Sequence, residues 1–507
     1  MDTLLYKSEQ YTPLRDPVTM VSSEKKTALL MGFGSVMVVL GAVMVVYWPA
    51  IFLSQLKTMM ILTNVSRSYN IWRETPIPMY LEFHMFNITN VNELLARNDT
   101  MLRVREMGPY VFRETHHKAN ITWNDNSTVT FYNQRWWHFA PELSNGSLSD
   151  ELTSINPVLV SAGYESRRSS AFVLMGLDAL MRHYHSSMFL TANVSSWLFD
   201  GMNDDFLTAV RDLPFVNTPF DKFGWFYTRN GSMTYDGVFN MNTGSEQFSS
   251  LGNVERWRHS DRTHYRGECG AVRGSTGELW APELGQQQVD IFAPDICTYL
   301  VLSKNRTVEI EGIEGVLYST NDSTFDNGYK HPETECYCEE PRDADCLPSG
   351  ALNVSLCQHG APAFVSLPHF LHADPYYPSK IDGLAPKQEH NFQLALEMYT
   401  GMPLSVSAQL QINLLVRHMT GLPMNNMLPD SDTLVPMFWF RQEVRITPEY
   451  ARQARLALSL RYGVPYAFYA ITAIGVALLV VGIGIMVRRL LRTPEGARII
   501  DSEDVAQ

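Results

Sequence analysis

The sequence predicts an α+β membrane protein in which two terminal transmembrane helices bracket one large, disulfide-bonded ectodomain. Three observations support this fold class. An uncharged apolar segment lies near each end of the chain, glycosylation sequons occur only between these segments, and short alternating stretches typical of strands occur there too. The predicted parts are a cytosolic tail at 1–26, a transmembrane helix at 27–54, the ectodomain at 55–462, a second transmembrane helix at 463–487 and a second cytosolic tail at 488–507.

The first apolar segment extends from Thr27 to Leu56 without a charged residue. A helix that crosses a ~30 Å hydrocarbon core needs ~20 apolar residues, so this segment is long enough. Lys25 and Lys26 precede it, which places its N-terminal end in the cytosol. A cleaved signal peptide is the alternative, but its apolar region would be only ~7–15 residues long and would end at a small-residue cleavage site. We therefore interpret the segment as an uncleaved signal-anchor.

The second apolar segment, Tyr462–Val487, is also uncharged, and Arg488, Arg489 and Arg492 follow it directly. Because basic residues flank cytosolic ends of transmembrane helices, both tails are predicted to be cytosolic. The region between the two segments is then extracytoplasmic.

The positions of the N-x-S/T sequons agree with this topology. All eleven lie between the apolar segments, on the side where glycans are added. The predicted acceptors are Asn64, Asn87, Asn98, Asn120, Asn126, Asn145, Asn193, Asn230, Asn305, Asn321 and Asn353.

The six cysteines of the chain also lie in this region and allow three interpretations. Structural zinc sites favour C-x₂₋₄-C pairs that occur twice or with matching histidines, whereas the first pair here is C-x-C and the next gaps are seven and ten residues. A catalytic thiol would need a nearby base, which the sequence does not supply. An oxidising lumen favours three disulfides, each worth ~2–4 kcal/mol. The cysteines are Cys269, Cys297, Cys336, Cys338, Cys346 and Cys357.

The charge of the chain indicates the class of partner. Residues 1–26 and 488–507 each sum to zero, so the net charge of −13 lies between them and argues against nucleic acid as a partner. All 14 histidines lie between His84 and His418, and protonating every one would bring −13 to +1. This pattern suits a protein that meets acidic pH, and an ordinary acidic secretory surface is the alternative.

Motifs of common enzyme classes are missing from the sequence. It contains no H-E-x-x-H, G-x-S-x-G, P-loop or dinucleotide fingerprint, and Gly32-Phe33-Gly34 lies inside an apolar segment. We therefore predict that the protein is not an enzyme and has no cofactor. His369 and His372 are spaced i, i+3, but without a third ligand they argue against a metal site.

Local patterns inside the ectodomain predict both strands and helices. Alternation of apolar and polar residues predicts strands at Ser127–Trp137, Arg306–Ser319 and Pro436–Ile446. Residues 157–210 are predicted to be a helical region, including a second short helix around Ser195–Leu198 that is entered through the apolar pair Met188-Phe189. Its first helix begins where Asn156 caps and Pro157 takes the first turn.

Several longer motifs occur in order along the chain. They are REMGPYVFRE at 105–114, HSSMFLTANVSSWLFDGMNDDFL at 185–207, FAPDIC at 292–297, AFVSLPHFLHADP at 363–375, TGMPLSVSAQLQINLLV at 400–416 and VPMFWF at 435–440. With the cysteine spacing and the two terminal segments, they resemble the class B scavenger receptors. That family includes the fatty-acid translocase, the high-density-lipoprotein receptor, the lysosomal integral membrane protein and insect sensory-neuron members. The resemblance covers nearly the whole chain.

The resemblance implies a fold and a set of disulfides. The fold is a short, irregular antiparallel β-barrel with an internal lipid tunnel and a helical bundle at the end far from the membrane, which matches the helical region at about 157–210. The implied disulfides are Cys269–Cys336, Cys297–Cys357 and Cys338–Cys346. Six cysteines alone would allow 15 pairings, so spacing does not select these three.

The resemblance also implies a function. It predicts a receptor that binds lipids or lipoprotein-like particles and helps hydrophobic ligands, such as a fatty acid, a sterol or a carotenoid, to reach the membrane. The alternative is a receptor for a lumenal or extracellular protein, either a lysosomal sorting receptor with pH-dependent cargo release or an engulfment and adhesion receptor. The expected location is the plasma membrane, with cycling to or residence in endosomes or lysosomes, and self-association is left open.

The candidate ligand-binding residues lie in the helical region. Arg182, His183 and His185 would give it a basic tip that attracts an anionic headgroup or carboxylate. The fatty-acid translocase has lysines where this chain has His183 and His185. Because histidine titrates near ~6.5, anion binding should strengthen as the pH falls. Solvated polar residues are the alternative. An apolar cleft beside the tip, with core packing as its alternative, would consist of Met188, Phe189, Trp197 and Phe199.

Both tails contain candidate sorting signals. Tyr11 to Leu14 matches a tyrosine-x-x-bulky signal, and Glu495 with Ile499 and Ile500 approximates an acidic dileucine signal. A chance match and an unstructured tail are the alternatives. Neither tail contains cysteine, which excludes palmitoylation there.

Overall fold

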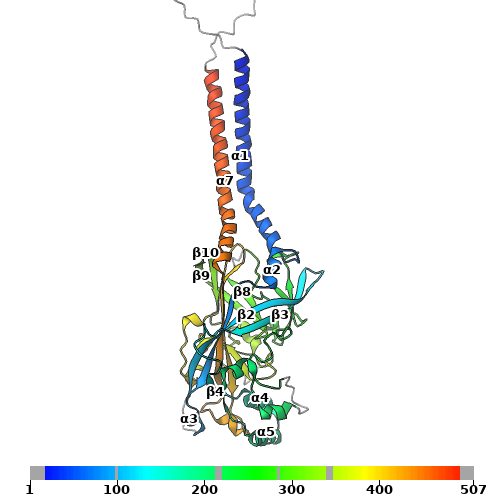
Figure 1. Ribbon diagram of the computed structural model, residues 1–507, viewed down its shortest axis with the longest axis vertical. Helices are drawn as coiled ribbons and strands as arrows, with labels where there is room; N and C mark the ends of the chain where they lie inside the picture. Colours follow the sequence, from blue (N-terminus) through cyan, green and yellow to red (C-terminus); the bar gives the residue numbers. More distant parts are fainter. Residues whose placement is uncertain (1–16, 97–100, 212–219, 283–285, 339–345, 492–507) are drawn as a thin grey trace, which may run out of the picture. The chain divides into compact units, whose positions relative to one another are not determined.

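The structure is a computed structural model that describes residues 17–96, 101–211, 220–282, 286–338 and 346–491 (Figure 1). The chain divides into two compact units, one of Met1–Leu56 with Arg452–Gln507 and one of Lys57–Ala451. Six predicted site residues lie outside the described residues, namely Tyr11, Leu14, Asn98, Glu495, Ile499 and Ile500.

The first unit contains most of two long helices, α1 (Pro17–Met60) and α7 (Pro448–Leu490). Both are long and apolar enough to cross a membrane, as predicted. They run side by side (Figure 1), and the backbones come close where a Cβ on Gly34 would lie 3.0 Å from the carbonyl oxygen of Gly475. The Trp48 indole also donates to the Leu460 carbonyl at 3.2 Å. Small residues and interhelical hydrogen bonds are the means by which helices associate in lipid.

The second unit is built on a sheet that has 14 strands among the described residues, and all of its strand pairs are antiparallel except β13 with β2. Its main path runs β7-β6-β3-β2-β1-β16-β15-β14-β10-β9-β8, while β11 and β12 extend from β15 and β13 pairs with β2. The first and last strands pair with each other, with Phe83 opposite Phe440. The strands are β1 (Met79–Ile88), β2 (Leu102–Trp123), β3 (Thr128–Phe139), β6 (Val238–Asn242), β7 (Val254–Trp257), β8 (Gln288–Ala293), β9 (Thr298–Ile310), β10 (Ile313–Ser319), β11 (Ala351–Asn353), β12 (Ala363–Ser366), β13 (Ile381–Asp382), β14 (Gln393–Leu396), β15 (Pro403–Val416) and β16 (Thr433–Arg445).

A two-residue bridge, Gly274-Ser275, joins the edge strands β7 and β8 and closes the sheet. Val254 of β7 donates to the Gly274 carbonyl at 2.8 Å, and Ser275 donates to the Asp290 carbonyl of β8 at 3.0 Å. Gly274 has φ +93°, and a Cβ there would lie 2.6 Å from the Asp290 oxygen, so the bridge requires glycine. The predicted α+β fold with an irregular antiparallel β-barrel is confirmed. The internal tunnel stays a prediction.

Two of the three predicted strands match the structure closely, and the third prediction was wrong in one respect. All of residues 127–137 except Ser127 lie in β3, and all of residues 436–446 except Ile446 lie in β16. Residues 306–319 are two strands, because the chain turns at Glu311 and Gly312, which have φ of 51° and 72°. The alternating pattern continues through this hairpin turn and hides it.

The predicted helical region contains short helices and one strand. The Asn156 side chain accepts hydrogen bonds from the first turn of α4, and Pro157 is its first residue, as expected. However, β5 (Phe189–Asn193) interrupts the helices and pairs with β4 (Glu151–Ile155). The pair Met188-Phe189 therefore enters a strand, and the short helix after it is η2. The helices of the region are α4 (Pro157–Glu165), η1 (Ser166–Arg168), α5 (Ala171–His183), η2 (Ser196–Asp200) and α6 (Asp205–Arg211).

Helices occur at both ends of the second unit. In Figure 1, α4 and α5 lie at one end of this unit, whereas α2, β9 and β10 lie at the other. The remaining described helices are α2 (Arg67–Arg73), α3 (Val91–Leu95), η3 (Phe248–Ser250), η4 (Gly267–Gly270), η5 (Pro332–Tyr337), η6 (Pro368–Phe370), η7 (Pro378–Lys380), η8 (Gln388–His390) and η9 (Pro423–Asn426).

Candidate functional site

Helix α5 presents an apolar face to solvent. Phe172 is 84% exposed and Met175 is 67% exposed, while Leu174 and Met181 on the opposite face are buried. The Ser170 side chain caps the helix by accepting from the Val173 N–H. Large apolar side chains that stay exposed together on a folded protein mark a surface for binding.

The basic tip lies at the C-terminal end of the same helix. Arg182, His183 and His185 are all exposed there, next to the negative end of the helix dipole, which favours cations. Arg182 also pairs with Asp178 at 2.8 Å, which offsets part of its charge. His185 adopts a left-handed conformation with φ 50° and turns the chain away from the helix.

The predicted apolar cleft residues lie in the core rather than on the surface beside the tip. Met188, Phe189 and Trp197 are buried, and Phe199 is half-buried among aromatic rings inside the barrel. The Phe199 ring centroid lies 4.9 Å from that of Phe112. Core packing, the alternative interpretation, accounts for these positions.

An aromatic cluster inside the barrel was not found from the sequence. Phe83 lies at its centre, with ring centroids 4.9 Å from Phe226, 5.6 Å from Phe112 and 5.8 Å from Phe438. Its members come from β1, β2, β16 and the segment after α6, so no local pattern could have revealed it. The cluster makes this part of the barrel interior apolar.

A network of buried charges shares the interior with these rings. Lys118 Nζ lies 2.6 Å from the Glu278 carboxylate, and His116 Nε2 lies 2.8 Å from it. Burial alone would raise the pKa of Glu278, but Lys118 and His116 lower it to about 2. Burial would lower the pKa of His116, yet its hydrogen bonds to Glu114 and Glu278 raise it above the usual value. The carboxylate and the imidazolium therefore favour each other's charged form.

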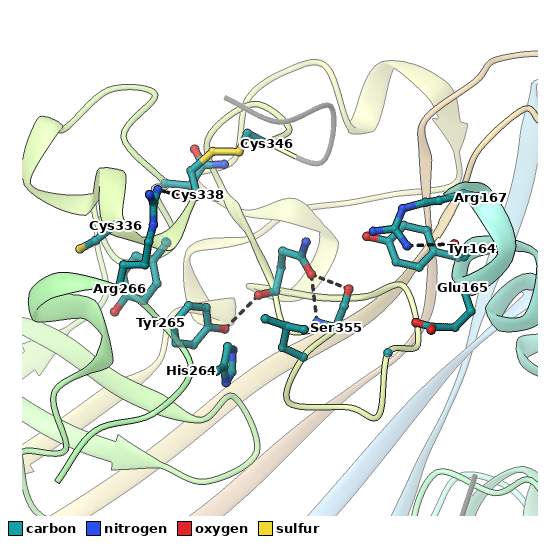
Figure 2. Close-up of a pocket in the computed structure, with 15 residues that line it drawn as sticks. Tyr164, Glu165, Arg167, His264, Tyr265, Arg266, Cys336, Cys338, Cys346 and Ser355 are labelled. Carbon is teal, nitrogen blue, oxygen red and sulfur yellow. Dashed lines mark hydrogen bonds between the residues drawn. A yellow bond between two sulfur atoms is a disulfide. The ribbon is translucent and has the colours of Figure 1, made fainter. Parts of the chain in front are cut away.

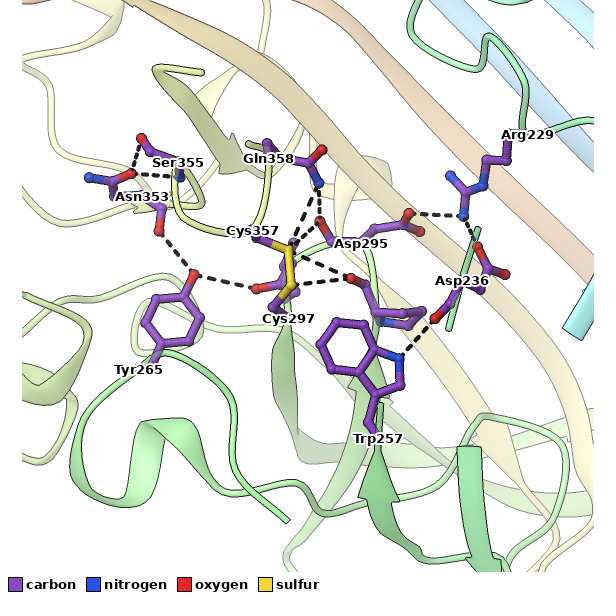
Figure 3. Close-up of a disulfide and its surroundings, with 12 residues drawn as sticks. Arg229, Asp236, Trp257, Tyr265, Asp295, Cys297, Asn353, Ser355, Cys357 and Gln358 are labelled. Carbon is purple, nitrogen blue, oxygen red and sulfur yellow. Dashed lines mark hydrogen bonds and ion pairs between the residues drawn. A yellow bond between two sulfur atoms is a disulfide. The ribbon is translucent and has the colours of Figure 1, made fainter. Parts of the chain in front are cut away.

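The Cys297–Cys357 disulfide lies next to a second group of buried charges, formed by Arg229, Asp236 and Asp295. Figure 3 shows the Cys297–Cys357 disulfide beside Asp295, whose carboxylate lies 2.9 Å from Arg229. Arg229 also pairs with Asp236 at 3.0 Å. Burial would lower the pKa of the Arg229 guanidinium, but the two aspartates raise it. The disulfide thus holds one carboxylate in place for a buried cation.

The other two disulfides border a cleft beside helix α4. The structure contains Cys269–Cys336, Cys297–Cys357 and Cys338–Cys346, the three pairs that the resemblance implies.

In Figure 2 this cleft lies between Glu165 at the end of α4 and the segment of Tyr265 and Arg266. Its volume is about 100 Å³. Burial raises the pKa of Glu165, although Arg167 opposes the shift. The Arg266 guanidinium donates to the Cys338 carbonyl, which links the segment of Tyr265 and Arg266 to the segment that carries Cys336 and Cys338.

His369 and His372 do not converge on a common point. His369 Nε2 lies 2.7 Å from Glu106, whereas His372 Nε2 lies 3.0 Å from Asn391. Within the described ranges, no group of three or more His, Cys, Asp or Glu side chains has the geometry to hold a metal ion.

The described sequons differ in exposure. The acceptors Asn87, Asn321 and Asn353 are half-buried, and the Asn87 side chain accepts a hydrogen bond from the Thr153 N–H at 2.8 Å. The exposed ones are Asn64, Asn120, Asn126, Asn145, Asn193, Asn230 and Asn305. Glycan occupancy at all of them stays a prediction.

Comparison with known proteins shows which family the sequence resembles. The sequence model described as the CD36 family matches residues 32–486. Protein peste of Drosophila melanogaster is 32% identical over 415 residues, which cover 81% of this chain and 73% of that protein. Scavenger receptor class B member 1 of Cricetulus griseus is 34% identical over 417 residues, covering 81% and 79%. Lysosome membrane protein 2 of Homo sapiens is 28% identical over 429 residues, covering 82% and 85%.

Proposed function

Since the chain belongs to the CD36 family and is a membrane receptor of that family, we propose that it binds lipids or lipid-bearing particles at helix α5 and passes hydrophobic ligands toward the membrane. The exposed apolar face of α5 carries this proposal. Phe172 and Met175 offer apolar contact to acyl chains, and Arg182 and His183 lie on the last turn of the same helix, where they attract anionic headgroups.

The barrel interior supports the second part of the proposal. The aromatic cluster around Phe83 and Phe226 offers an apolar path for a fatty acid, a sterol or a carotenoid. The buried charges around Lys118 and Glu278 lie in the same interior. Because an apolar ligand gains nothing from contact with charged groups, it would pass along the aromatic cluster instead. Transfer down a gradient needs no catalytic group, and we propose that the protein is not an enzyme.

The proposed topology follows from the sequence. The apolar segments at 27–54 and 463–487 would cross the membrane, and both tails would be cytosolic. The ectodomain at 55–462 would then face the exterior or a lumen, with α5 at the end opposite α2 (Figure 1). We place the receptor at the plasma membrane with traffic through endosomes or lysosomes.

A test of ligand identity uses the full-length receptor purified in mild detergent. Mass spectrometry of co-purifying molecules should identify lipids that are lost from a Phe172→Ser, Met175→Ser variant. Ile71→Ser, which changes an exposed apolar side chain on α2 (42% exposed), is the matched control and should retain them. Retention of the same lipids by the α5 variant would contradict the proposal.

A second function, capture of a protein partner, is favoured by the same exposed side chains. Large apolar residues rimmed by charge are typical of protein-binding hot spots. In the experiment above, a protein that co-purifies with the wild type and not with the α5 variant would support this alternative.

A further inference from the structure

A segment on the outer face of the sheet is held by two imidazole rings. The Ala385 N–H donates to His369 Nδ1, and the Lys387 N–H donates to His390 Nδ1, both at 3.2 Å. Residues 385–389 are exposed, and Pro386 between the two donors has no N–H. We call the segment 383–389 the cover, and the buried His390 follows it.

The ends of the cover are attached to strands. Ile381 and Asp382 pair with β2, and Gly383, with φ +97°, packs so closely on the Val104 carbonyl that a Cβ would lie 2.0 Å from it. At the other end, Gln409 Nε2 of β15 donates to the Glu389 carbonyl at 2.7 Å. The two imidazoles hold the part between these attachments.

Beneath the cover is a cavity of about 280 Å³. Its floor is the outer face of β1, β15 and β16, including His84, Gln409 and Trp439. The Glu106 carboxylate lies at its side and accepts from His84 Nδ1 at 2.8 Å, from His369 Nε2 at 2.7 Å and from Trp439 Nε1 at 3.2 Å. Burial would raise the pKa of Glu106, but the bonds from these histidines and the tryptophan hold it well below its usual range.

These contacts fix the protonation state of the two rings. His369 donates from Nε2 to Glu106 and accepts at Nδ1 from Ala385, so the ring in this arrangement is neutral. A second proton would have to occupy Nδ1, where it would face the Ala385 N–H. The His390 ring is neutral for the same reason, because its Nδ1 accepts a hydrogen bond from the Lys387 N–H. Neither ring can be charged while it holds the cover.

The surrounding charges decide how the rings respond to acid. Glu106 of β2 stays ionised, and its carboxylate contacts both His369 and His84 of β1. Lys387 pairs with Glu389 on the cover at 3.3 Å, and Arg441 of β16 pairs with Glu82, so these cations are already compensated. The His369 and His390 rings are stacked with centroids 4.9 Å apart, and two charges there would repel.

The turn that carries His369 is itself under tension. His369, Phe370 and His372 all adopt left-handed conformations, with φ of 54°, 58° and 61°. Such conformations are unfavourable for residues other than glycine and persist where surrounding contacts hold them. The His369 N–H donates to Gln411 at 2.7 Å, and its ring is held by Glu106.

We propose that the segment 383–389 is an acid-released cover over this cavity. In the released state, Nδ1 of His369 carries a proton, with the Glu106 carboxylate as its counter-charge, and it no longer accepts from Ala385. Protonation of His390 releases Lys387, and the cover lifts away from the sheet between its two attachments.

The sign of the effect follows from His390. Burial and the neighbouring His369 lower the pKa of His390 to about 4. A histidine whose pKa is lowered stabilises the closed form above its ordinary value of ~6.5, and this contribution is lost as the pH falls toward 4. The closed form is therefore destabilised over the acidic pH range of endosomes and lysosomes.

Hydrogen exchange on the full-length receptor tests the cover. Protection of the Ala385 and Lys387 amides, corrected for the intrinsic pH dependence of exchange, should fall about tenfold or more between about pH 7 and about pH 5. Amides of β15 should keep their protection and serve as the internal reference. Equal protection of the cover at both pH values would overturn the proposal.

A pair of variants separates titration from simple loss of contact. His369→Asn with His390→Asn keeps an acceptor near each Nδ1 position that does not titrate, so protection should become independent of pH. His418→Asn is the control, because His418 binds the Leu428 carbonyl and does not line the cavity. If the double variant still loses protection in acid as the wild type does, the imidazoles are not the switch.

Discussion

His116 and Glu278 meet inside the barrel, with Nε2 and Oε1 2.8 Å apart, although 162 residues separate them in the chain. His116 belongs to β2, and Glu278 follows the Gly274-Ser275 bridge that closes the sheet. The contact therefore links strand β2 to the segment that follows the Gly274-Ser275 bridge. Lys118 joins the same carboxylate at 2.6 Å, so one buried anion holds two groups of β2.

Replacing Glu278 by Gln should strongly destabilise the ectodomain. The Lys118 side chain is fully buried and would lose the carboxylate that Glu278 provides. It would retain its hydrogen bond to Asn133 Oδ1 at 2.7 Å. Removing one partner of a buried ion pair costs about 3–5 kcal/mol. Thermal or denaturant unfolding of the purified receptor measures the loss. Glu142→Gln, whose exposed pair with Arg113 should contribute less than about 1 kcal/mol, is the control.

Stability should decline as the pH rises through the titration of His116. Because the folded structure raises the pKa of His116, its contribution is complete below ~6.5 and is lost above that value as the pH passes the raised pKa. The midpoint of unfolding should be higher at about pH 6 than at about pH 8. His116→Gln should reduce this slope, and the exposed His138→Gln should leave it unchanged. A slope that survives His116→Gln would assign it to other groups.

Loss of the Cys297–Cys357 disulfide should cost more than loss of Cys338–Cys346. The first closes a separation of 60 residues and the second only 8. Loop-closure entropy then gives about 4 kcal/mol for the first and about 2.5 kcal/mol for the second. The first also positions Asp295 for Arg229. Serine pairs at each bridge, compared by denaturant unfolding, measure the order, and equal losses would argue against this account.

Anion binding at the α5 tip should strengthen in acid. His183 and His185 are exposed at this tip, and histidine is the side chain whose charge ordinarily changes between about pH 5 and about pH 8. Binding of the receptor to vesicles with anionic lipid should increase several-fold, to about tenfold, between about pH 7.4 and about pH 5. His183→Lys with His185→Lys should bind equally well at both pH values. Binding by this variant that still depends on pH would place the titrating groups elsewhere.

The closing bridge of the barrel can be tested with two matched glycines. Gly274 and Gly277 both have φ +93°, but a Cβ on Gly274 would meet the Asp290 carbonyl, whereas Gly277 has nothing within 4 Å. Gly277→Ala should cost about 1–2 kcal/mol from backbone strain alone. Gly274→Ala should cost more, since β8 must also move. Equal losses in unfolding experiments would mean that the bridge tolerates a side chain.

The sequence was sufficient for features that depend on local pattern. Charge-free apolar length predicted α1 and α7, the Asn156-Pro157 pair predicted the start of α4, and alternation predicted β3 and β16. It failed where backbone conformation changes without a change in pattern, as at the Glu311-Gly312 turn. The strand β5 was hidden because Phe189–Asn193 is short and lies between helices.

The interior sites required three-dimensional information. Glu278, His116 and Lys118 come from segments about 160 positions apart, and each looks like an ordinary surface residue in the sequence. The cover was equally hidden, because His369 and His390 act through ring nitrogens whose partners are backbone N–H groups. Phe172 and Met175 are exposed on the same helix as the buried Leu174, and only the three-dimensional structure distinguishes them.

The pairing of β1 with β16 has a consequence for biosynthesis. Met79 lies opposite Val444, so in the proposed topology β1 enters the lumen first and gains β16 as its second neighbour only when the last strand arrives. The sheet cannot be completed during translocation, and long-range pairing of this kind is slow. Until β16 arrives, the Phe83 side of β1 is open to chaperones and to other chains. Newly made receptor should therefore remain in the endoplasmic reticulum for a period set by export of the whole chain.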